Sequence, residues 1–173
     1  MPTPRWLPLA AGALVAACGP SLEPAPDFTL SDVNSSSARY GEDVSPRDYL
    51  GRVSAWYFGH ATCGYCSSQF GYLDELQAEL DGMEPPVAID ILGVNYAGYE
   101  SGNETITSGR DLPWLQDTPQ EDVIGRWGPA FRDLVVLDGD NDLLDVYNLT
   151  EHTLADPSNY AELKDLLVNA AAE

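Results

Sequence analysis

The chain has 173 residues, of which 44% are hydrophobic, and it carries 28 Asp and Glu against 8 Lys and Arg, a formal net charge of -20. This length corresponds to about one domain, and the hydrophobic fraction is large enough to bury a core, which excludes a disordered acidic chain. The charge excludes a nucleic-acid-binding protein, because so acidic a body repels phosphate groups.

The amino terminus has the composition of an export signal. Arg5 is the one charged residue before position 18, and a mainly apolar run follows it. About a dozen apolar residues are too few to span a bilayer, whereas a charged start, a short apolar middle and small residues at the end are typical of a secretory signal. Val15-Ala16-Ala17-Cys18 resembles the lipobox of bacterial lipoproteins. This resemblance implies that residues 1–17 are removed and that Cys18 is acylated.

The segment after this signal predicts a spacer. Residues 18–26 are rich in proline, which favours an extended tether between the lipid and a domain over residues 27–173. An ordinary signal peptide with a chance cysteine is the alternative. We expect a monomer in the bacterial cell envelope, held at a membrane by the lipid on Cys18, with its domain in the periplasm or outside the cell.

The first half of the domain alternates strand and helix signals. Ser45-Pro46 has the form of a helix N-cap followed by proline at the first helical position. The β-branched and aromatic run over residues 52–59 predicts a buried strand. From Gly64, apolar residues recur at three- and four-residue spacing until Gly82, which predicts a helix. Residues 87–94 predict a second buried strand.

The second half predicts a hairpin and a closing helix. The expected elements, in chain order, are a polar loop over residues 95–110, a short helix over 119–127, strands over 133–137 and 143–147, and a helix over 157–172. Thr118 is expected to cap the short helix, with Pro119 at its first position. The Gly-Asp-Asn-Asp sequence between the two strands is typical of a hairpin turn.

These elements predict an α/β sandwich with a mixed sheet. Strands over 52–59 and 87–94, joined by a long helix, must be parallel neighbours with a right-handed crossover, and the hairpin adds antiparallel strands at one side. Cys63 then lies just past the carboxyl end of a central strand, where α/β sheets place ligand sites. It also lies at the start of a helix, where partial positive charge and free N–H groups stabilise an anion.

Cys63 and Cys66 form a Cys-Gly-Tyr-Cys motif, and they are the remaining pair if Cys18 carries the lipid. A disulfide across so short a loop contributes little stability, which favours redox chemistry or metal binding instead. Disulfide exchange needs a thiolate, and a helix start lowers the pKa of a thiol. Cys63 is therefore the expected nucleophile and Cys66 the residue that resolves the mixed disulfide. This chemistry needs no cofactor and no metal.

With this motif in place, residues 25–170 resemble the thioredoxin-like superfamily. The resemblance implies a three-layer α/β sandwich and a redox-active Cys63-Cys66 pair. Two positions depart from the superfamily. A cis proline usually precedes the first hairpin strand, where this chain has Phe131-Arg132-Asp133, and thioredoxins proper bury an acid at the position of Tyr57.

Within the superfamily, the order of elements is most similar to the N-terminal domain of selenoprotein P. The matching features are Val94-Asn95 at a strand end, a polar loop, Pro113-Trp114, a short helix over 123–127 and the hairpin. Selenoprotein P has selenocysteine where Cys63 stands. The resemblance implies redox or peroxide-related thiol chemistry, with protein or small-molecule thiols and disulfides as partners.

Four residues are candidates to line the site: His60, Thr62, Tyr65 and Arg132. His60 either stabilises the thiolate or joins a metal site, or it is an ordinary polar residue at a strand end. Arg132 is one of very few cations, and we hypothesise that it lowers the pKa of Cys63. A surface ion pair is the alternative for Arg132.

Three functions are compatible with the sequence. The first is a thiol–disulfide oxidoreductase, with a thiol peroxidase as its variant. The second is a copper chaperone, because two thiolates with His60 or His152 suit Cu(I), although thioredoxin-like copper chaperones usually space their cysteines by three residues. The third is a binding lipoprotein that keeps the fold and holds an inert disulfide.

Overall fold

The structure is a computed structural model that describes residues 24–172. The predicted signal peptide over residues 1–17, the lipidation site Cys18 and the tether as far as residue 23 lie outside the described residues. Within the described part of the chain, no helix combines the length and the apolar character needed to cross a bilayer.

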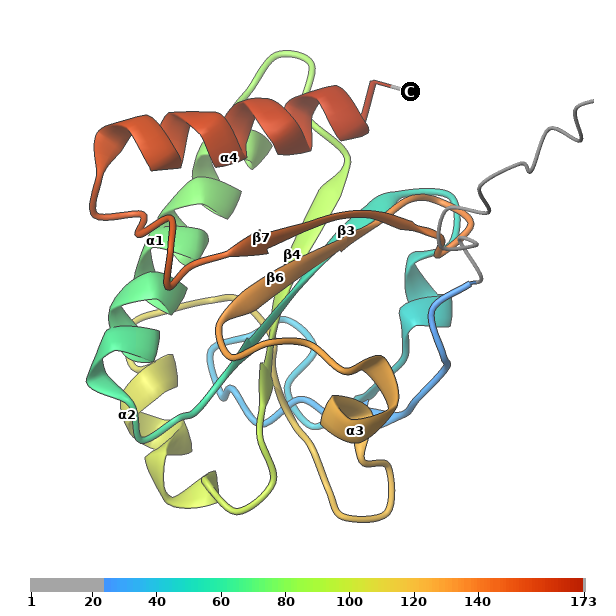
Figure 1. Ribbon diagram of the computed structural model, residues 1–173, viewed down its shortest axis with the longest axis vertical. Coiled ribbons are helices and arrows are strands. Elements are labelled where there is room, and N and C mark those ends of the chain that lie inside the picture. Colours follow the sequence, from blue (N-terminus) through green and yellow to red (C-terminus); the bar gives the residue numbers. More distant parts are fainter. Residues whose placement is uncertain (1–23, 173) are drawn as a thin grey trace, which may run out of the picture.

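The main sheet has five strands in the order β5-β4-β3-β6-β7 (Figure 1). The strands are β3 (Val53–Gly59), β4 (Ile89–Asn95), β5 (Trp114–Gln116), β6 (Asp133–Leu137) and β7 (Leu143–Asn148). β4 runs parallel to β3 and β5, whereas β6 runs antiparallel to β3 and β7. The predicted mixed sheet, with central parallel strands and a C-terminal hairpin, is confirmed.

Helices and a small second sheet cover the two faces of the main sheet. The other elements are β1 (Leu30–Ser31), β2 (Asp43–Val44), the 3-10 turns η1 (Pro46–Tyr49) and η2 (Glu100–Gly102), and the helices α1 (Gly64–Asp81), α2 (Asn103–Thr107), α3 (Val123–Trp127) and α4 (Pro157–Ala170). α1 and α4 pack on one face, and α3 packs with the β1–β2 hairpin on the other.

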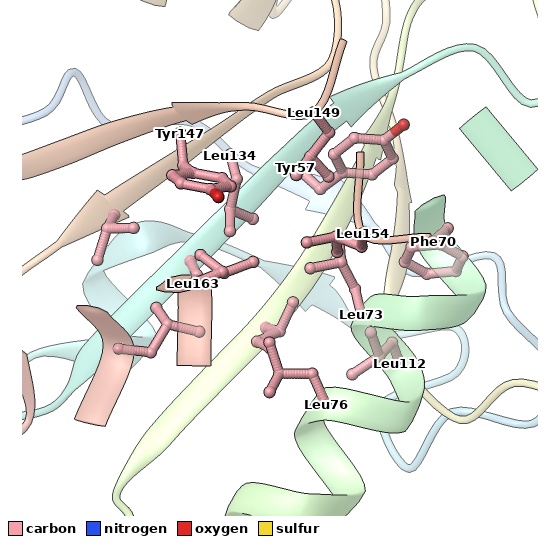
Figure 2. Packing of buried hydrophobic residues seen from close by; sticks show 14 of the residues in the cluster. Tyr57, Phe70, Leu73, Leu76, Leu112, Leu134, Tyr147, Leu149, Leu154 and Leu163 are labelled. Atoms are coloured by element: carbon pink, nitrogen blue, oxygen red, sulfur yellow. The ribbon is translucent and has the colours of Figure 1, made fainter. Parts of the chain in front are cut away.

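β3 lies at the centre and is buried on both faces, as its apolar run predicts. Successive side chains of a strand point to opposite faces, so Tyr57 lies in the core under α1 and α4, whereas Trp56 and Phe58 lie in the core under α3. Figure 2 shows the first of these cores, where Phe70 of α1 and Leu163 of α4 meet the sheet.

Two helix ends have the predicted chemistry. The Ser45 hydroxyl accepts the N–H of Arg47 at 3.0 Å, and the Asp48 carboxylate accepts the N–H of Ser45, which completes a capping box. α1 ends at Gly82, whose N–H donates to the Ala78 carbonyl at 3.1 Å. α1 also begins at Gly64, so the predicted long helix is confirmed at both ends.

Two predictions in the middle of the chain are wrong. The stretch 95–110 is not all loop, because η2 and α2 form within it and bury Ile106. The short helix predicted over 119–127 begins only at Val123 with Asp122 as its N-cap, and residues 119–121 form a turn instead. Its predicted cap, Thr118, instead accepts the N–H of Glu121 in this turn.

Strand boundaries and number also differ from the prediction. The strand expected over 87–94 begins at Ile89, two residues later. β5 adds a third parallel strand at the sheet edge, and β1 pairs with β2 outside the main sheet.

The chain enters the domain at the amino-terminal end of β3. The N–H of Ala25 donates to the Asn141 carbonyl at 2.8 Å in the β6–β7 turn, and the Trp127 indole donates to the Pro26 carbonyl at 2.8 Å. Residues 25 and 26, the end of the predicted tether, therefore contact the β6–β7 turn and α3. The same turn contacts the segment before β3, because the Gly51 N–H donates to the Gly139 carbonyl at 2.7 Å.

Candidate active site

Cys63 is the N-cap of α1, the 18-residue helix that follows the central strand β3. Its sulfur accepts the backbone N–H of Cys66 at 3.1 Å, which satisfies one of the free donors at the helix start. Cys63 is partly exposed, whereas Cys66 lies one turn further into the helix and is fully buried. Both are free thiols. The arrangement presents one sulfur to solvent and keeps the other beneath it.

The surroundings of Cys63 favour its ionised form. Burial by itself raises the pKa of Cys63, but hydrogen bonds from the Cys66 side chain and backbone and from the Arg132 guanidinium outweigh burial, and the net pKa is lowered. The first turn of α1 contains no acidic residue that would oppose the positive helix end. Cys66 is affected in the opposite direction, because burial and the neighbouring Cys63 raise its pKa.

Arg132 lies directly over the cysteine pair. Its Nη2 donates to the Cys63 sulfur at 3.7 Å, and its Nη1 donates to the Thr150 hydroxyl at 3.1 Å. The guanidinium also lies over two aromatic rings, 4.7 Å from the centre of Tyr65 and 4.2 Å from that of Phe131. The sequence hypothesis placed Arg132 opposite the thiols, and the structure brings it into contact with Cys63.

The backbone at Arg132 is unusual. It has a φ of 71°, in the left-handed region that non-glycine residues seldom adopt. Its N–H donates to the Phe58 carbonyl at 3.0 Å, and its carbonyl accepts the N–H of Leu149 at 2.9 Å. These two hydrogen bonds hold the residue between β3 and the loop after β7. The chain has no proline at this position, where the superfamily usually has a cis proline, and no cis peptide bond occurs here among the described residues.

Tyr65, between the two cysteines, lies at the rim of the site. Its side chain is 39% exposed, and its hydroxyl donates to the Leu149 carbonyl at 3.0 Å. Gln69, one turn later, accepts the N–H of Leu154 at 2.9 Å and donates to the Thr153 hydroxyl at 3.1 Å. These contacts attach the first two turns of α1 to the loop after β7.

His60 belongs to an aromatic cluster beside the cysteines. Its ring stacks on Tyr99 with centroids 3.9 Å apart, and it contacts Tyr96 and Phe131 at 4.6 and 4.4 Å. Burial lowers the pKa of His60, and the positive charge of Arg132 lowers it further, so the ring is largely neutral at pH 7. A neutral imidazole contributes packing here and no positive charge for the thiolate.

Thr62 is exposed and lines a pocket of ≈ 270 Å³ beside Cys63, together with Ser67 and Ser101. The wall that contains Ser101 comes from the η2–α2 segment, which the sequence predicts as a loop. Gly102 makes this close approach possible, because a Cβ there would lie 2.4 Å from the Ala61 carbonyl carbon. The pocket is therefore built on a backbone contact that only glycine permits.

Asn95 also supports the site, a role that its position in the sequence did not predict. It ends β4 with its side chain buried, and its Oδ1 accepts the N–H of Ala61 at 2.9 Å. Its amide donates to Asn103 at 3.0 Å and to Gln116 at 2.7 Å. A buried amide at the end of an apolar strand is the signal that points to such a support. Asn95 fixes the loop that leads to Cys63.

The described residues offer little to a metal ion. Across residues 24–172, no group of three or more His, Cys, Asp or Glu side chains is arranged to hold one. Of the two histidines considered for copper, His60 is stacked among aromatic rings, and His152 lies 4.0 Å from the Glu162 carboxylate.

No protein-family model matches the chain, and no curated protein shows significant similarity to it. Solved structures do match. A secreted thiol-disulfide isomerase from Corynebacterium glutamicum is 19% identical with a TM-score of 0.64, over 86% of this chain and 86% of that chain. A thiol:disulfide interchange protein of the thioredoxin family from Chlorobium tepidum is 16% identical with a TM-score of 0.61, over 86% and 95%.

A secreted disulfide oxidoreductase from Mycobacterium tuberculosis also matches, at 16% identity and a TM-score of 0.59, over 83% of this chain and 95% of that chain. At these identities the comparisons establish the fold. The chain therefore has a thioredoxin-like α/β fold, as the sequence predicts.

Proposed function

We propose that the protein is a thiol–disulfide oxidoreductase in which Cys63 is the nucleophile and Cys66 the resolving residue. The observation that carries this proposal is the partly exposed Cys63 sulfur at the start of α1, which accepts hydrogen bonds from the Cys66 backbone and from Arg132. The similar solved structures support it, because they are described as thiol-disulfide isomerases, interchange proteins and oxidoreductases.

The reaction follows from the unequal burial of the two sulfurs. The Cys63 thiolate attacks one sulfur of a substrate disulfide, forms a mixed disulfide and releases the first substrate thiolate, which takes up a proton. Cys66 then loses its proton and attacks the Cys63 sulfur. The Cys63–Cys66 disulfide forms, and the second substrate thiol leaves. The substrate gains two electrons and two protons, and the protein dithiol loses them.

The cellular setting is also part of the proposal. We infer that residues 1–17 are an export signal and that the lipid on Cys18 holds the domain, as a monomer, at a membrane of the bacterial envelope. The matching secreted proteins support an extracytoplasmic setting. The kinship with the N-terminal domain of selenoprotein P belongs to the same proposal, and with it thiol-based peroxide reduction as a variant activity.

Reduction of insulin by dithiothreitol tests the proposal. The wild-type chain is expected to accelerate insulin precipitation, and Cys63→Ser is expected to remove the acceleration. Cys66→Ser is expected to leave a trapped mixed disulfide, which mass spectrometry detects. Cys18→Ser is the matched control, because it removes a cysteine without touching the pair. An unaccelerated reaction in wild type, with stoichiometric Cu(I) uptake, would instead identify a copper-binding protein.

A further inference from the structure

Tyr57 has a buried hydroxyl without an ordinary partner. Its side chain is fully buried, and its oxygen is the one tyrosine oxygen among the described residues that is buried and makes no hydrogen bond of standard geometry. Buried polar groups in proteins are nearly always paired, so an exception calls for an explanation.

The hydroxyl points from the core toward the cysteine loop. The Tyr57 ring stacks on Phe70 of α1 with centroids 6.4 Å apart and planes inclined by 14°. Figure 2 shows the oxygen directed away from Leu73 and Leu76. At this end of the ring, a Cβ on Gly59 would lie 3.2 Å from the oxygen, so the hydroxyl lies beneath the last residue of β3.

Cys66 lies on the same side of α1 as Phe70. The two residues are four apart on the helix, so their side chains lie one above the other on the same face. Both are fully buried in the core cluster that contains Tyr57. Cys66 therefore lies one turn before Phe70 on the face of α1 that packs against the Tyr57 ring.

The pKa shifts allow the Tyr57 hydroxyl to act as a hydrogen-bond donor when Cys66 becomes a thiolate. Burial raises the pKa of Tyr57 well above its ordinary value, and the charge and hydrogen bonding of Cys66 raise it further. The hydroxyl thus keeps its proton throughout the range in which thiols titrate. Burial also raises the pKa of Cys66. Deprotonation of Cys66 is therefore unfavourable, and it must precede the second exchange step.

We propose that the Tyr57 hydroxyl donates a hydrogen bond to the Cys66 sulfur as that sulfur becomes a thiolate, and so accelerates resolution of the mixed disulfide. The inference rests on the proposed function. In the assisted step, the Cys66 thiol gives its proton to water, its sulfur bonds to the Cys63 sulfur, and the bond between Cys63 and the substrate sulfur breaks. The departing substrate thiolate takes up a proton, so the overall step conserves protons.

A single-turnover reaction separates the two exchange steps. The reduced full chain with Cys18→Ser is mixed with one equivalent of dithiodipyridine, an uncharged disulfide that releases a coloured thione at each step. The first release reports attack by Cys63, and the second reports attack by Cys66. Tyr57→Phe is expected to leave the first rate unchanged and to slow the second about tenfold near neutral pH. Its pH–rate curve for the second step is expected to rise at higher pH than that of wild type.

Tyr147→Phe is the matched control. Its hydroxyl lies in the same core but donates to the Asn159 carbonyl and to Glu162, at 3.2 and 2.9 Å. Loss of this hydroxyl is expected to change neither release rate. Tyr57→Phe keeps the ring that stacks on Phe70 and loses a buried hydroxyl that makes no hydrogen bond of standard geometry, so urea unfolding is expected to show no loss of stability.

Equal second-step rates in wild type and Tyr57→Phe would overturn the inference and leave the proposed function intact. Slowing that is accompanied by loss of stability would assign the effect to packing and would also overturn the inference. Two other outcomes would contradict the proposed function itself. They are a first thione release that does not depend on Cys63, and a second thione release that persists in Cys66→Ser.

Discussion

The guanidinium of Arg132 donates to the sulfur of Cys63 at 3.7 Å, across 69 residues of sequence. This contact depends on the sheet. β6 pairs with β3 so that Leu134 lies opposite Tyr57, and the residues just before β6 therefore face the loop that follows β3. The left-handed backbone of Arg132 fixes the direction from which its side chain reaches the sulfur.

Arg132→Ala is expected to make Cys63 a weaker nucleophile. Loss of the hydrogen bond and of the positive charge raises the pKa of the Cys63 thiol, because both favour the ionised form. The rate of alkylation by iodoacetamide at neutral pH is expected to fall by up to about tenfold, which corresponds to about 1.4 kcal/mol. Alkylation rates measured across pH with mass-spectrometric assignment to Cys63 give the shift.

Arg126→Ala is the control for this experiment, because Arg126 forms a surface ion pair with Glu121 at 3.1 Å and makes no contact with the cysteines. An unchanged pH profile for Cys63 in Arg132→Ala would show that Arg132 does not contribute to stabilising the thiolate.

The stability of the reduced protein should depend on pH through Cys63. The folded pKa of Cys63 is below its ordinary value, so ionisation stabilises the folded state. This contribution is present above the unfolded pKa and is lost as pH falls through the folded pKa. The difference in unfolding free energy between reduced wild type and Cys63→Ser is therefore expected to grow in favour of wild type from pH about 6 to about 9. Urea unfolding under reducing conditions measures it, and a difference that shrinks over this range would contradict the lowered pKa.

Gly102→Ala is expected to disturb the loop before Cys63. The added methyl would lie 2.4 Å from the Ala61 carbonyl carbon and 2.7 Å from the Thr62 nitrogen, and these are backbone atoms that cannot turn aside. We expect a loss of about 1–3 kcal/mol in unfolding free energy and a changed alkylation rate at Cys63. Gly64→Ala is the control, because a Cβ at Gly64 has no neighbour within 4 Å. Equal stability of the two variants would show that the η2–α2 segment is not packed on this loop.

Asn95→Ala is expected to lower the unfolding free energy by about 2 kcal/mol, because it leaves the buried N–H of Ala61 without its acceptor and removes the hydrogen bonds to Asn103 and Gln116. Asn159→Ala, which removes one side-chain hydrogen bond to a loop carbonyl, is expected to cost less. Urea unfolding of both variants makes the comparison. A cost at Asn95 no greater than that at Asn159 would argue against its role as the support of the cysteine loop.

The sequence predicts those elements whose apolar spacing is strong and whose ends carry clear signals. β3 is a continuous apolar run, and α1 has apolar residues at helical spacing up to Gly82. The position of Cys63 at the start of α1 follows from these two elements. The burial of Cys66 follows from its place one turn into the helix.

The remaining elements depend on contacts that periodicity does not reveal. α2 has five residues and buries a single large apolar side chain, Ile106, so its helical form depends on its neighbours. α3 begins late because the buried Asp117 carboxylate accepts the N–H groups of Val123 and Ile124, at 3.2 and 3.3 Å. A capping acid six residues before the helix has no standard sequence signature. The support from Asn95 and the orphan hydroxyl of Tyr57 likewise appear only when the elements are assembled.

The chain entry near the β6–β7 turn has a consequence for orientation. Ala25 is attached at the amino end of β3, and Cys63 follows its carboxyl end, so the length of this seven-residue strand, about 23 Å, separates them. If Cys18 carries a lipid, the anchor would join the folded domain at the end of β3 opposite the nucleophile. The lipid would then leave the surface around Cys63 free for disulfide substrates.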